Sequence, residues 1–230
     1  MPERPLGQEN FLDLRANPQL HLKVYRSTQT NIIVNDSLPP WRSPIARALH
    51  RNRSQPVARY FQLATIDRDL HPHNRTLVFR GWLEPGSELQ SVTDIRSSKA
   101  INLLAGASPW AEVCWYFPTT REQFRMSGTL RLVTAECPVT SDCKARQQAW
   151  TQMSDAGRIQ FDWATPGADR SADPQAFAPP QPDPQQPSAN FCLLSLAATK
   201  VVHLELRGDP QNCYSYELVD GQWQMRSINP

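Results

Sequence analysis

The stretch Ala111-Glu112-Val113-Cys114-Trp115-Tyr116-Phe117 predicts a β-strand, because its alternation places Trp115 and Phe117 on one face and Tyr116 on the other. Similar stretches, separated by short turns, surround it. They run from Tyr60 to Ile66, Thr76 to Leu83, Leu89 to Thr93, and Gln123 to Val133. This series predicts an antiparallel meander that closes into a small barrel, since closure removes sheet edges that would otherwise aggregate.

Three helices are predicted around these strands. The first covers Trp41 to His50, with Ser43 as its N-cap and Pro44 at its first position. The second covers Ser97 to Leu104 and interrupts the series of strands. The third covers Ser141 to Met153.

The C-terminal third of the chain is predicted to add four more strands to the same barrel. They run from Phe191 to Leu196, Val201 to Leu206, Tyr214 to Val219, and Gln222 to Ile228. Seven prolines in residues 165–187 predict a loop or a disordered excursion. Residues 1–37 carry only short apolar patches and are interpreted as an N-terminal arm, so we expect a single domain over residues 38–230.

The charge and hydropathy of the chain disfavour several classes of partner. The 230 residues include 24 basic and 22 acidic side chains, for a net charge of +2, which disfavours binding to nucleic acid or an anionic membrane. No apolar stretch approaches the roughly 18 to 20 residues that a membrane-spanning helix needs. The N-terminus has charges where a secretory signal would be apolar, so a cytoplasmic location is expected.

The spacing of cysteine and histidine predicts neither a disulfide framework nor a metal site. The five cysteines are an odd set without a C-x-x-C pair, and we expect them to be reduced. His71-Pro72-His73 lies in a predicted turn with no third ligand in sight, so metal binding is not expected. The common hydrolase, phosphate-loop and dinucleotide-binding motifs are absent from the sequence.

A group of anion-binding side chains lies among the predicted strands. Ser97-Ser98-Lys99 opens a helix, where free backbone N–H groups and the positive end of the helix dipole favour a phosphate. Arg75 and Arg80 are five residues apart, so strand alternation sends them to opposite faces and one of them is expected to point to a site. Gln123 offers an amide to the polar edge of a ring. These residues indicate a phosphate-bearing ligand, with helix capping and surface charge as the alternative.

The chain resembles the flavin-binding half of the pyridoxamine 5'-phosphate oxidase family, above all its branch of oxidase-related, FMN-binding proteins. Four successive motifs carry the resemblance: Arg75 to Arg80, Thr93 to Ala100, Trp115 to Pro118, and Gln123 to Gly128. The clear match covers roughly Leu38 to Val133. The resemblance implies a mainly β split barrel with peripheral helices, a homodimer, and FMN at the subunit interface.

The same resemblance assigns roles to individual residues. It implies flavin contacts from Arg75, Thr76, Leu77, Val78 and Gln123, phosphate contacts from Thr93, Ser97, Ser98 and Lys99, and Arg80 in place of a lysine near the ring and the substrate. The family usually shows Ser-Arg-Lys where this chain has Ser97-Ser98-Lys99. Whether Arg96, one step earlier, replaces the missing guanidinium is left open.

The substrate half of the family pattern is missing. The family's oxidases hold pyridoxal phosphate with a tyrosine, an arginine and a serine around the third helix predicted here, and with an Arg-Leu-His run near the C-terminus. This chain has Lys-Ala-Arg-Gln-Gln-Ala-Trp at residues 144–150 and Leu-Glu-Leu-Arg at residues 204–207. Pyridoxamine phosphate is therefore not the expected substrate.

The sequence thus predicts an FMN-dependent oxidoreductase that acts on an unidentified small molecule. Arg80 is the candidate residue near the flavin ring and the substrate. A flavin needs few protein groups for its chemistry, so the absence of an acid–base motif does not argue against catalysis. The alternatives are a non-catalytic flavin-binding or storage protein, and a structural barrel dimer without a cofactor.

Overall fold

The structure is a computed structural model that describes residues 38–83 and 87–230. The helices are α1 Arg42–Arg51, α2 Ser98–Leu104, α3 Thr140–Thr151 and α4 Asp155–Arg158, and the 3-10 helices are η1 Pro56–Arg59, η2 Ile159–Asp162 and η3 Pro174–Phe177. The strands are β1 Tyr60–Ile66, β2 Pro72–Val78, β3 Gly81–Leu83, β4 Glu88–Asp94, β5 Trp110–Phe117, β6 Glu122–Val133, β7 Phe191–Glu205, β8 Asn212–Val219 and β9 Gln222–Ile228. The predicted arm, residues 1–37, lies outside the described residues.

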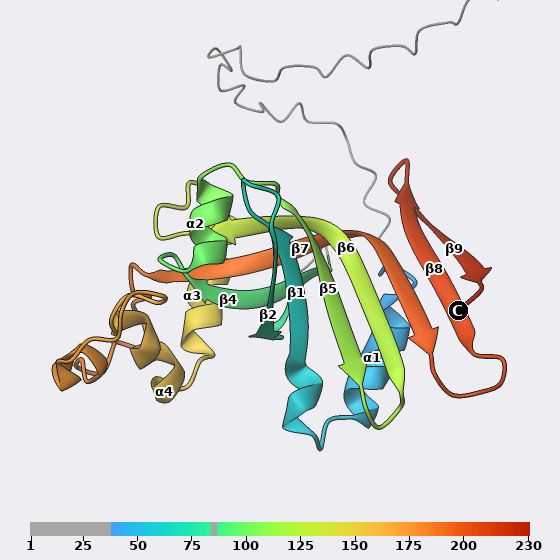
Figure 1. Ribbon diagram of the computed structural model, residues 1–230, viewed down its shortest axis with the longest axis horizontal. Helices are drawn as coiled ribbons and strands as arrows, with labels where there is room; N and C mark the ends of the chain where they lie inside the picture. Colours follow the sequence, from blue (N-terminus) through green and yellow to red (C-terminus); the bar gives the residue numbers. More distant parts are fainter. Residues whose placement is uncertain (1–37, 84–86) are drawn as a thin grey trace, which may run out of the picture. The chain divides into compact units, whose positions relative to one another are not determined.

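The described strands form one antiparallel sheet that curls into a split barrel. Its order is β2-β1-β5-β6-β7-β4-β3, and β8 and β9 extend it from the second half of β7. The two ends of the curl meet where the Ser91 hydroxyl on β4 donates to the Val78 carbonyl on β2 at 3.0 Å. In Figure 1, α1 lies beside the lower part of the barrel, and α2 and α3 lie at its other end. The mainly β split barrel predicted from the sequence is confirmed.

Strand pairing departs from the predicted meander. β1 pairs with β5, and β4 pairs with β7 instead of its chain neighbour β5. Residues 76–83 do not form one strand, because the chain bends at Phe79 and Arg80 between β2 and β3. Conversely, the two strands predicted over residues 191–196 and 201–206 are one strand, β7, which ends at Glu205.

Two local predictions are wrong. Trp41, not Ser43, is the N-cap of α1, and its ring is buried against Trp82 and Trp223 with centroids 5.6 and 5.8 Å away. Tertiary packing therefore sets the start of this helix. Cysteines 137 and 143 are bonded as a disulfide rather than reduced, since the turn before α3 brings their Cα atoms to 5.8 Å, well within disulfide reach.

Aromatic side chains fill the barrel. Trp115 is fully buried, its ring lies 4.8 Å from Phe79 and 5.1 Å from Phe117, and its indole N–H donates to the Ala58 carbonyl at 2.9 Å. The alternation of β5 is confirmed, because Phe117 is also buried whereas Tyr116 is 43% exposed. A second core cluster around Trp150, Phe161 and Phe191 packs α3 against the start of β7.

Residues 163–190 connect α4 to β7 over the outside of this second cluster. The Trp150 indole N–H donates to the Asp183 carbonyl at 2.9 Å, and the Arg146 guanidinium donates to the Ser188 carbonyl at 2.6 Å. Two side chains of α3 thus hold the proline-rich segment in place. No helix in the described part of the chain is long and apolar enough to cross a membrane.

The pairing of β6 with β7 depends on Gly128. The register shifts between Ser127 and Gly128, and a Cβ atom at Gly128 would lie 2.0 Å from the Ala197 carbonyl oxygen. A real Cβ atom cannot approach backbone so closely, so any larger residue must push the two strands apart.

We predict that Gly128→Ala lowers the free energy of unfolding by about 2 kcal/mol or more, because the strands cannot separate without losing core packing. Urea denaturation followed by tryptophan fluorescence measures this change. Gly157→Ala is the matched control, since its Cβ would meet side-chain atoms instead of backbone, Met153 Cε at 3.0 Å and Ser154 Oγ at 3.4 Å. Its effect should stay below about 1 kcal/mol, and equal losses in the two variants would contradict the role of Gly128.

Candidate functional site: a cationic cleft at the start of α2

The first candidate site lies where β4 ends and α2 begins. Thr93 is the penultimate residue of β4 and is buried, and the turn that follows is closed by the Ser97 N–H donating to the Asp94 carbonyl at 3.1 Å. Ser97 then caps α2 by position, with Lys99 in the first turn of the helix. The turn therefore gathers two hydroxyls and an ammonium at one point.

Lys99 is largely enclosed there. Its Nζ donates to Thr93 Oγ1 at 2.9 Å and to Ser97 Oγ at 3.1 Å, and the two hydroxyls lie 3.0 Å apart. Burial and the nearby charge of Arg75 lower the pKa of Lys99. Within the described ranges, Lys99 forms no ion pair with a carboxylate. A desolvated ammonium with only hydroxyl partners is stabilised by an added anion.

Arg75 supplies the second cation. It lies on β2 opposite Leu63 of β1, and its Nη1 donates to the Leu63 carbonyl at 3.1 Å and to Thr65 Oγ1 at 2.6 Å. Burial lowers the pKa of Arg75. Its hydrogen bonds to described residues all run from Nη1, which leaves Nε and Nη2 available to a ligand.

Thr93, Ser97 and Lys99 line a cleft of about 510 Å³ whose far wall is the segment after α4. Arg75 does not line it, but its charge acts on Lys99. That wall includes Trp163 and Arg170, and the Arg170 guanidinium lies 4.1 Å from the ring centroid of Phe177. The Trp163 indole N–H is buried and has no partner among the described residues. The wall thus contains an orphaned donor that is enclosed in the protein. The proline-rich composition of this segment gave no sign that it forms a wall of the cleft. Trp163 and Arg170 were the sequence signals that could have indicated this.

Arg96 holds this wall and does not face the cleft. Its guanidinium donates to both carboxylate oxygens of Asp94, at 3.0 and 2.7 Å, and to the carbonyls of Phe161 and Trp163, at 2.9 and 3.0 Å. The hydrogen bonds and charge of Asp94 raise the pKa of Arg96. With these donors engaged, Arg96 does not replace the guanidinium that Ser98 lacks.

The remaining predicted flavin and phosphate ligands from the first two motifs do not line the Lys99 cleft. Ser98 is exposed in the first turn of α2, and Thr76 is exposed on β2. Leu77 lines a small apolar cavity inside the barrel, and Val78 contributes its carbonyl to the bond with Ser91.

Arg80 lies in a second, smaller cleft. It follows β2 at the bend before β3, and burial and the nearby charge of Arg59 lower its pKa. The cleft, of about 170 Å³, also contains the amides of Gln90 on β4 and of Gln148 and Gln152 around α3. One guanidinium and three amides can hold an anionic or strongly polar group.

Gln123 lies far from both clefts within one chain. It pairs with Leu204 near the end of β7, whereas Thr93 pairs with Cys192 near its start. The twelve residues between these two positions correspond to up to roughly 40 Å of strand. This separation is well beyond the length of a flavin mononucleotide, so the structure does not bring Gln123 and Lys99 together in one subunit.

The turn between β1 and β2 contains His71 and is held by hydrogen bonds, whereas His73 lies on β2 and not in the predicted turn. Asp67 accepts from the backbone N–H groups of Asp69 and His71, both at 2.9 Å, and its other oxygen lies 2.9 Å from His73 Nε2. The bond with His73 and the backbone donors lower the pKa of Asp67 to about 2. These contacts account for the carboxylate without an ion.

The sequence of this chain is similar to those of known FMN-binding proteins and oxidases. Residues 38–134 match the family model described as "Pyridoxamine 5'-phosphate oxidase, FMN-binding domain". Pyridoxine/pyridoxamine 5'-phosphate oxidase 2 of Arabidopsis thaliana is 33% identical over 196 residues, covering 83% of this chain and 97% of that protein. The matched domain contains all the residues of the two clefts that come from β3, β4 and α2.

Two solved structures resemble the fold. A pyridoxamine 5'-phosphate oxidase-related, FMN binding protein from Nostoc punctiforme has a TM-score of 0.80 and 51% identity, covering 84% of this chain and all of the other. PhzG from Burkholderia lata, in complex with tetrahydrophenazine-1-carboxylic acid, has a TM-score of 0.67 at 16% identity, covering 85% and 95% of the two chains. The second likeness concerns the fold alone.

Proposed function

Because the chain belongs to the pyridoxamine 5'-phosphate oxidase-like family of FMN-binding proteins, we propose that it is an FMN-dependent oxidoreductase with a small anionic or polar substrate. The enclosed Lys99 ammonium, which has hydroxyl partners but no carboxylate, carries this proposal. FMN is the cofactor of the matched domain. When bound, it supplies the hydride chemistry for which this chain offers no acid–base motif of its own.

The residues of the first cleft fit the phosphate of FMN. Lys99 and the free donors of Arg75 would supply charge-assisted hydrogen bonds, and the hydroxyls of Thr93 and Ser97 would orient them. The Trp163 side chain forms part of the opposite wall. Both walls together would exclude water from the phosphate.

Arg80 would position the substrate. Its guanidinium lies in the cleft with Gln90, Gln148 and Gln152, where it would hold an anionic group while the amides read neighbouring polar atoms. Ala145 also lines this cleft and offers no polar group. This set differs from the tyrosine, arginine and serine with which the family's oxidases hold their phosphate.

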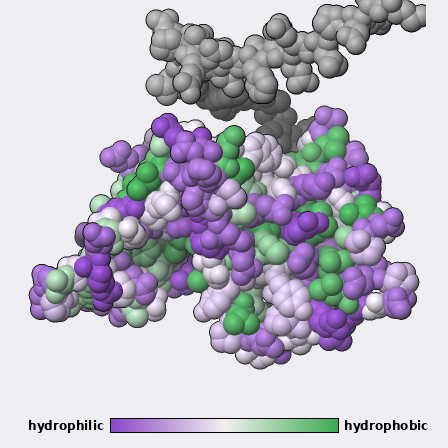
Figure 2. Space-filling view, viewed as in Figure 1, coloured by the Kyte–Doolittle hydropathy of each residue, from purple (hydrophilic) through white to green (hydrophobic). Residues whose placement is uncertain are grey.

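The active unit would be a homodimer. Since Gln123 and Lys99 lie at opposite ends of β7, one flavin can meet both only if the two residues come from different subunits. Large apolar side chains are also exposed on the outer side of the barrel strands, including Trp110 at 53% and Tyr60 at 43%. Figure 2 shows hydrophobic patches among a largely hydrophilic surface on one face of the molecule. A second copy would cover such residues.

Lys99→Met is expected to weaken FMN binding by about 1.5 to 3 kcal/mol, the value of a charge-assisted hydrogen bond. Flavin fluorescence quenching measures this loss, and riboflavin, which lacks the phosphate, should bind both proteins equally.

The wild-type affinity should fall as the pH rises through the lowered pKa of Lys99, because only the protonated ammonium attracts the phosphate. The variant should lose this pH dependence. Lys144→Met, at an exposed position on α3, is the control, and an equal loss there would refute the assignment.

Mixing two defective variants tests the shared site. If each flavin contacts Lys99 of one subunit and Gln123 of the other, Lys99→Met and Gln123→Ala homodimers each bind FMN poorly. After subunit exchange, about a quarter of the sites should recover, since half of the dimers are mixed and each has one intact site. No recovery after verified exchange would show that the site lies within one chain.

Substrate choice separates this proposal from a second candidate, pyridoxamine 5'-phosphate oxidation, which the name of the Arabidopsis relative favours. We expect the FMN-loaded protein to oxidise pyridoxamine 5'-phosphate with a kcat/KM well below the roughly 10⁴ M⁻¹s⁻¹ typical of dedicated enzymes. Oxygen consumption measures this rate, and a kcat/KM near roughly 10⁴ M⁻¹s⁻¹ would establish pyridoxamine 5'-phosphate oxidation as the function.

For any anionic compound found to bleach the flavin, Arg80→Gln should lower the turnover of that compound more than it lowers the FMN content of the protein. If no compound bleaches it, the protein is a flavin store.

A further inference from the structure

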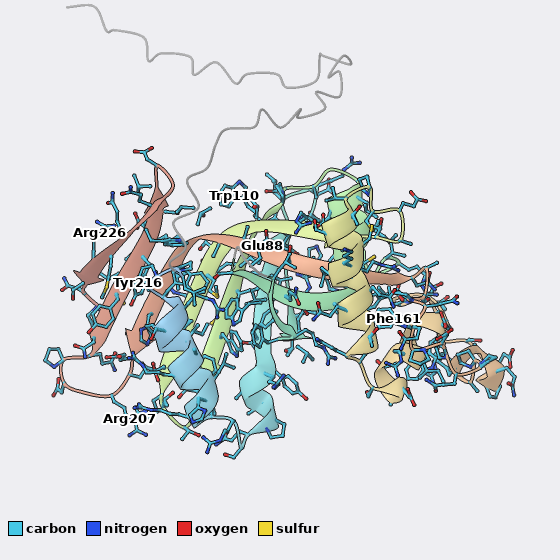
Figure 3. All side chains as sticks on the ribbon, turned by 180° about the vertical axis from the view of Figure 1, so that it is seen from behind. Glu88, Trp110, Phe161, Arg207, Tyr216 and Arg226 are labelled. Atoms are coloured by element: carbon cyan, nitrogen blue, oxygen red, sulfur yellow. A yellow bond between two sulfur atoms is a disulfide. The ribbon has the colours of Figure 1, made fainter. Side chains whose placement is uncertain are left out.

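A third cleft, of about 710 Å³, lies at the opposite end of β7 from Lys99. It is bounded by α1, by the turn between β5 and β6, and by the residues just after β7. Figure 3 shows Arg207, one of its lining residues, beside the end of α1, and Phe161, which lines the Lys99 cleft, on the far side of the molecule. We call this third cleft the arginine basin.

The packing of α1 produces one side of the basin. Ile45 and Ala48 are fully buried against the barrel, so the helix turns its other face outward. That face carries Arg47, His50 and Arg51, at the spacing that brings side chains together on a helix surface. The amphipathic pattern that anchors α1 therefore also lines the basin with basic groups.

Four arginines reach the basin, namely Arg47, Arg51, Arg53 and Arg207. None of them forms an ion pair with a carboxylate of the described residues. Several arginines elsewhere do: Arg96 with Asp94, Arg131 with Asp142, and Arg226 with Glu217, at 2.7, 2.6 and 3.0 Å. The basin is thus a concentration of unneutralised charge in a chain whose net charge is only +2.

Two of the basin arginines are already oriented. Arg207 Nη2 donates to the Thr119 carbonyl at 2.7 Å, and Arg53 Nη1 donates to the His50 carbonyl at 2.9 Å. Each bond uses one N–H of a planar group that has five, so donors remain for a ligand. A guanidinium that is already hydrogen-bonded loses less side-chain entropy when a ligand binds than an unconstrained guanidinium does.

The two acidic residues on the floor offset only part of the charge of the four arginines. Glu122 Oε2 lies 2.8 Å from Nε2 of His203, which is buried on the barrel side of the basin and stacked on Phe124. Burial alone would raise the pKa of Glu122, but hydrogen bonds from His203 and Thr120 and the nearby charges of His203 and Arg47 outweigh it, so the pKa is lowered. Glu205 accepts from the Asn212 amide at 3.0 Å.

We propose that the arginine basin is a second anion site, which binds a small phosphate-bearing molecule independently of the Lys99 cleft. Guanidinium groups match phosphate oxygens in pairs, and the basin has the volume of an ordinary small-ligand pocket. The near-neutral charge of the whole chain disfavours a long polyanion. Glu205 at the floor would select a ligand that also carries a hydrogen-bond donor.

Isothermal titration of the FMN-loaded protein with pyrophosphate tests the proposal, because bound FMN occupies the other phosphate site. We expect one pyrophosphate per chain with a dissociation constant below about 1 mM. The double variant Arg47→Gln/Arg51→Gln, and separately Arg207→Gln, should weaken binding at least about tenfold, the loss of one charge-assisted bond, and leave the FMN content unchanged. Arg125→Gln, at an exposed position of β6 outside the basin, is the matched control.

Three results would overturn the proposal: heat without saturation in the wild type, an equal loss in the Arg125→Gln control, or binding abolished by Lys99→Met. Tighter binding of a DNA oligonucleotide than of pyrophosphate, with a steep salt dependence, would assign the basin to nucleic acid instead. Because FMN content is measured in each case, a failure of the flavin proposal is distinguishable from a failure of this one.

Discussion

The backbone pairing of β7 is the constraint on which the barrel depends. This single strand, Phe191–Glu205, pairs with β6 along its length, with β4 over its first part and with β8 over its second part. Without it, β3 and β4 would have no backbone pairing to the hairpin of β5 and β6. The close approach of Gly128 to Ala197 lets the two longest strands stay paired through the irregularity in the middle.

The same strand separates the functional regions of the molecule. The Lys99 cleft lies near its first residues and the arginine basin near its last, so one rigid element sets the distance between two concentrations of positive charge. It also places Gln123 at the far end from Lys99. A barrel of this size has an interior filled with side chains, so ligands must bind on its outside and at its ends.

Electrostatic contrast distinguishes binding cations from structural ones. Arg96 and Arg146 are surrounded by carbonyl or carboxylate oxygens and tie the segment after α4 to the barrel. The hydrogen bonds of Lys99 and Arg75 run to hydroxyls and carbonyls only, and burial lowers the pKa of both, although the charge of Asp94 partly offsets this for Lys99. A partly buried cation without a carboxylate in hydrogen-bond contact is where an anionic ligand gains most.

The sequence by itself determined the local features. Alternation around Trp115 and the helix start at Ser97 are set by nearest-neighbour geometry, and the order of the motifs indicates the family. Arg75 and Lys99 were predictable as candidate anion ligands because of their residue types and their places in these motifs. Pairing partners could not, because β4 chooses β7 over β5 through contacts a hundred residues away in the chain.

Only the tertiary structure decided what the charged residues do. Nothing local distinguishes Arg96, which is bound to Asp94 and to the segment after α4, from Lys99, which faces the cleft. The wall formed by Trp163 and the meeting of α1 arginines with Arg207 join positions whose proximity depends on how the sheet curls. The disulfide between residues 137 and 143 depends on the turn before α3. The physical reason is that charge and thiol chemistry depend on neighbours in space, whereas periodicity records only neighbours along the chain.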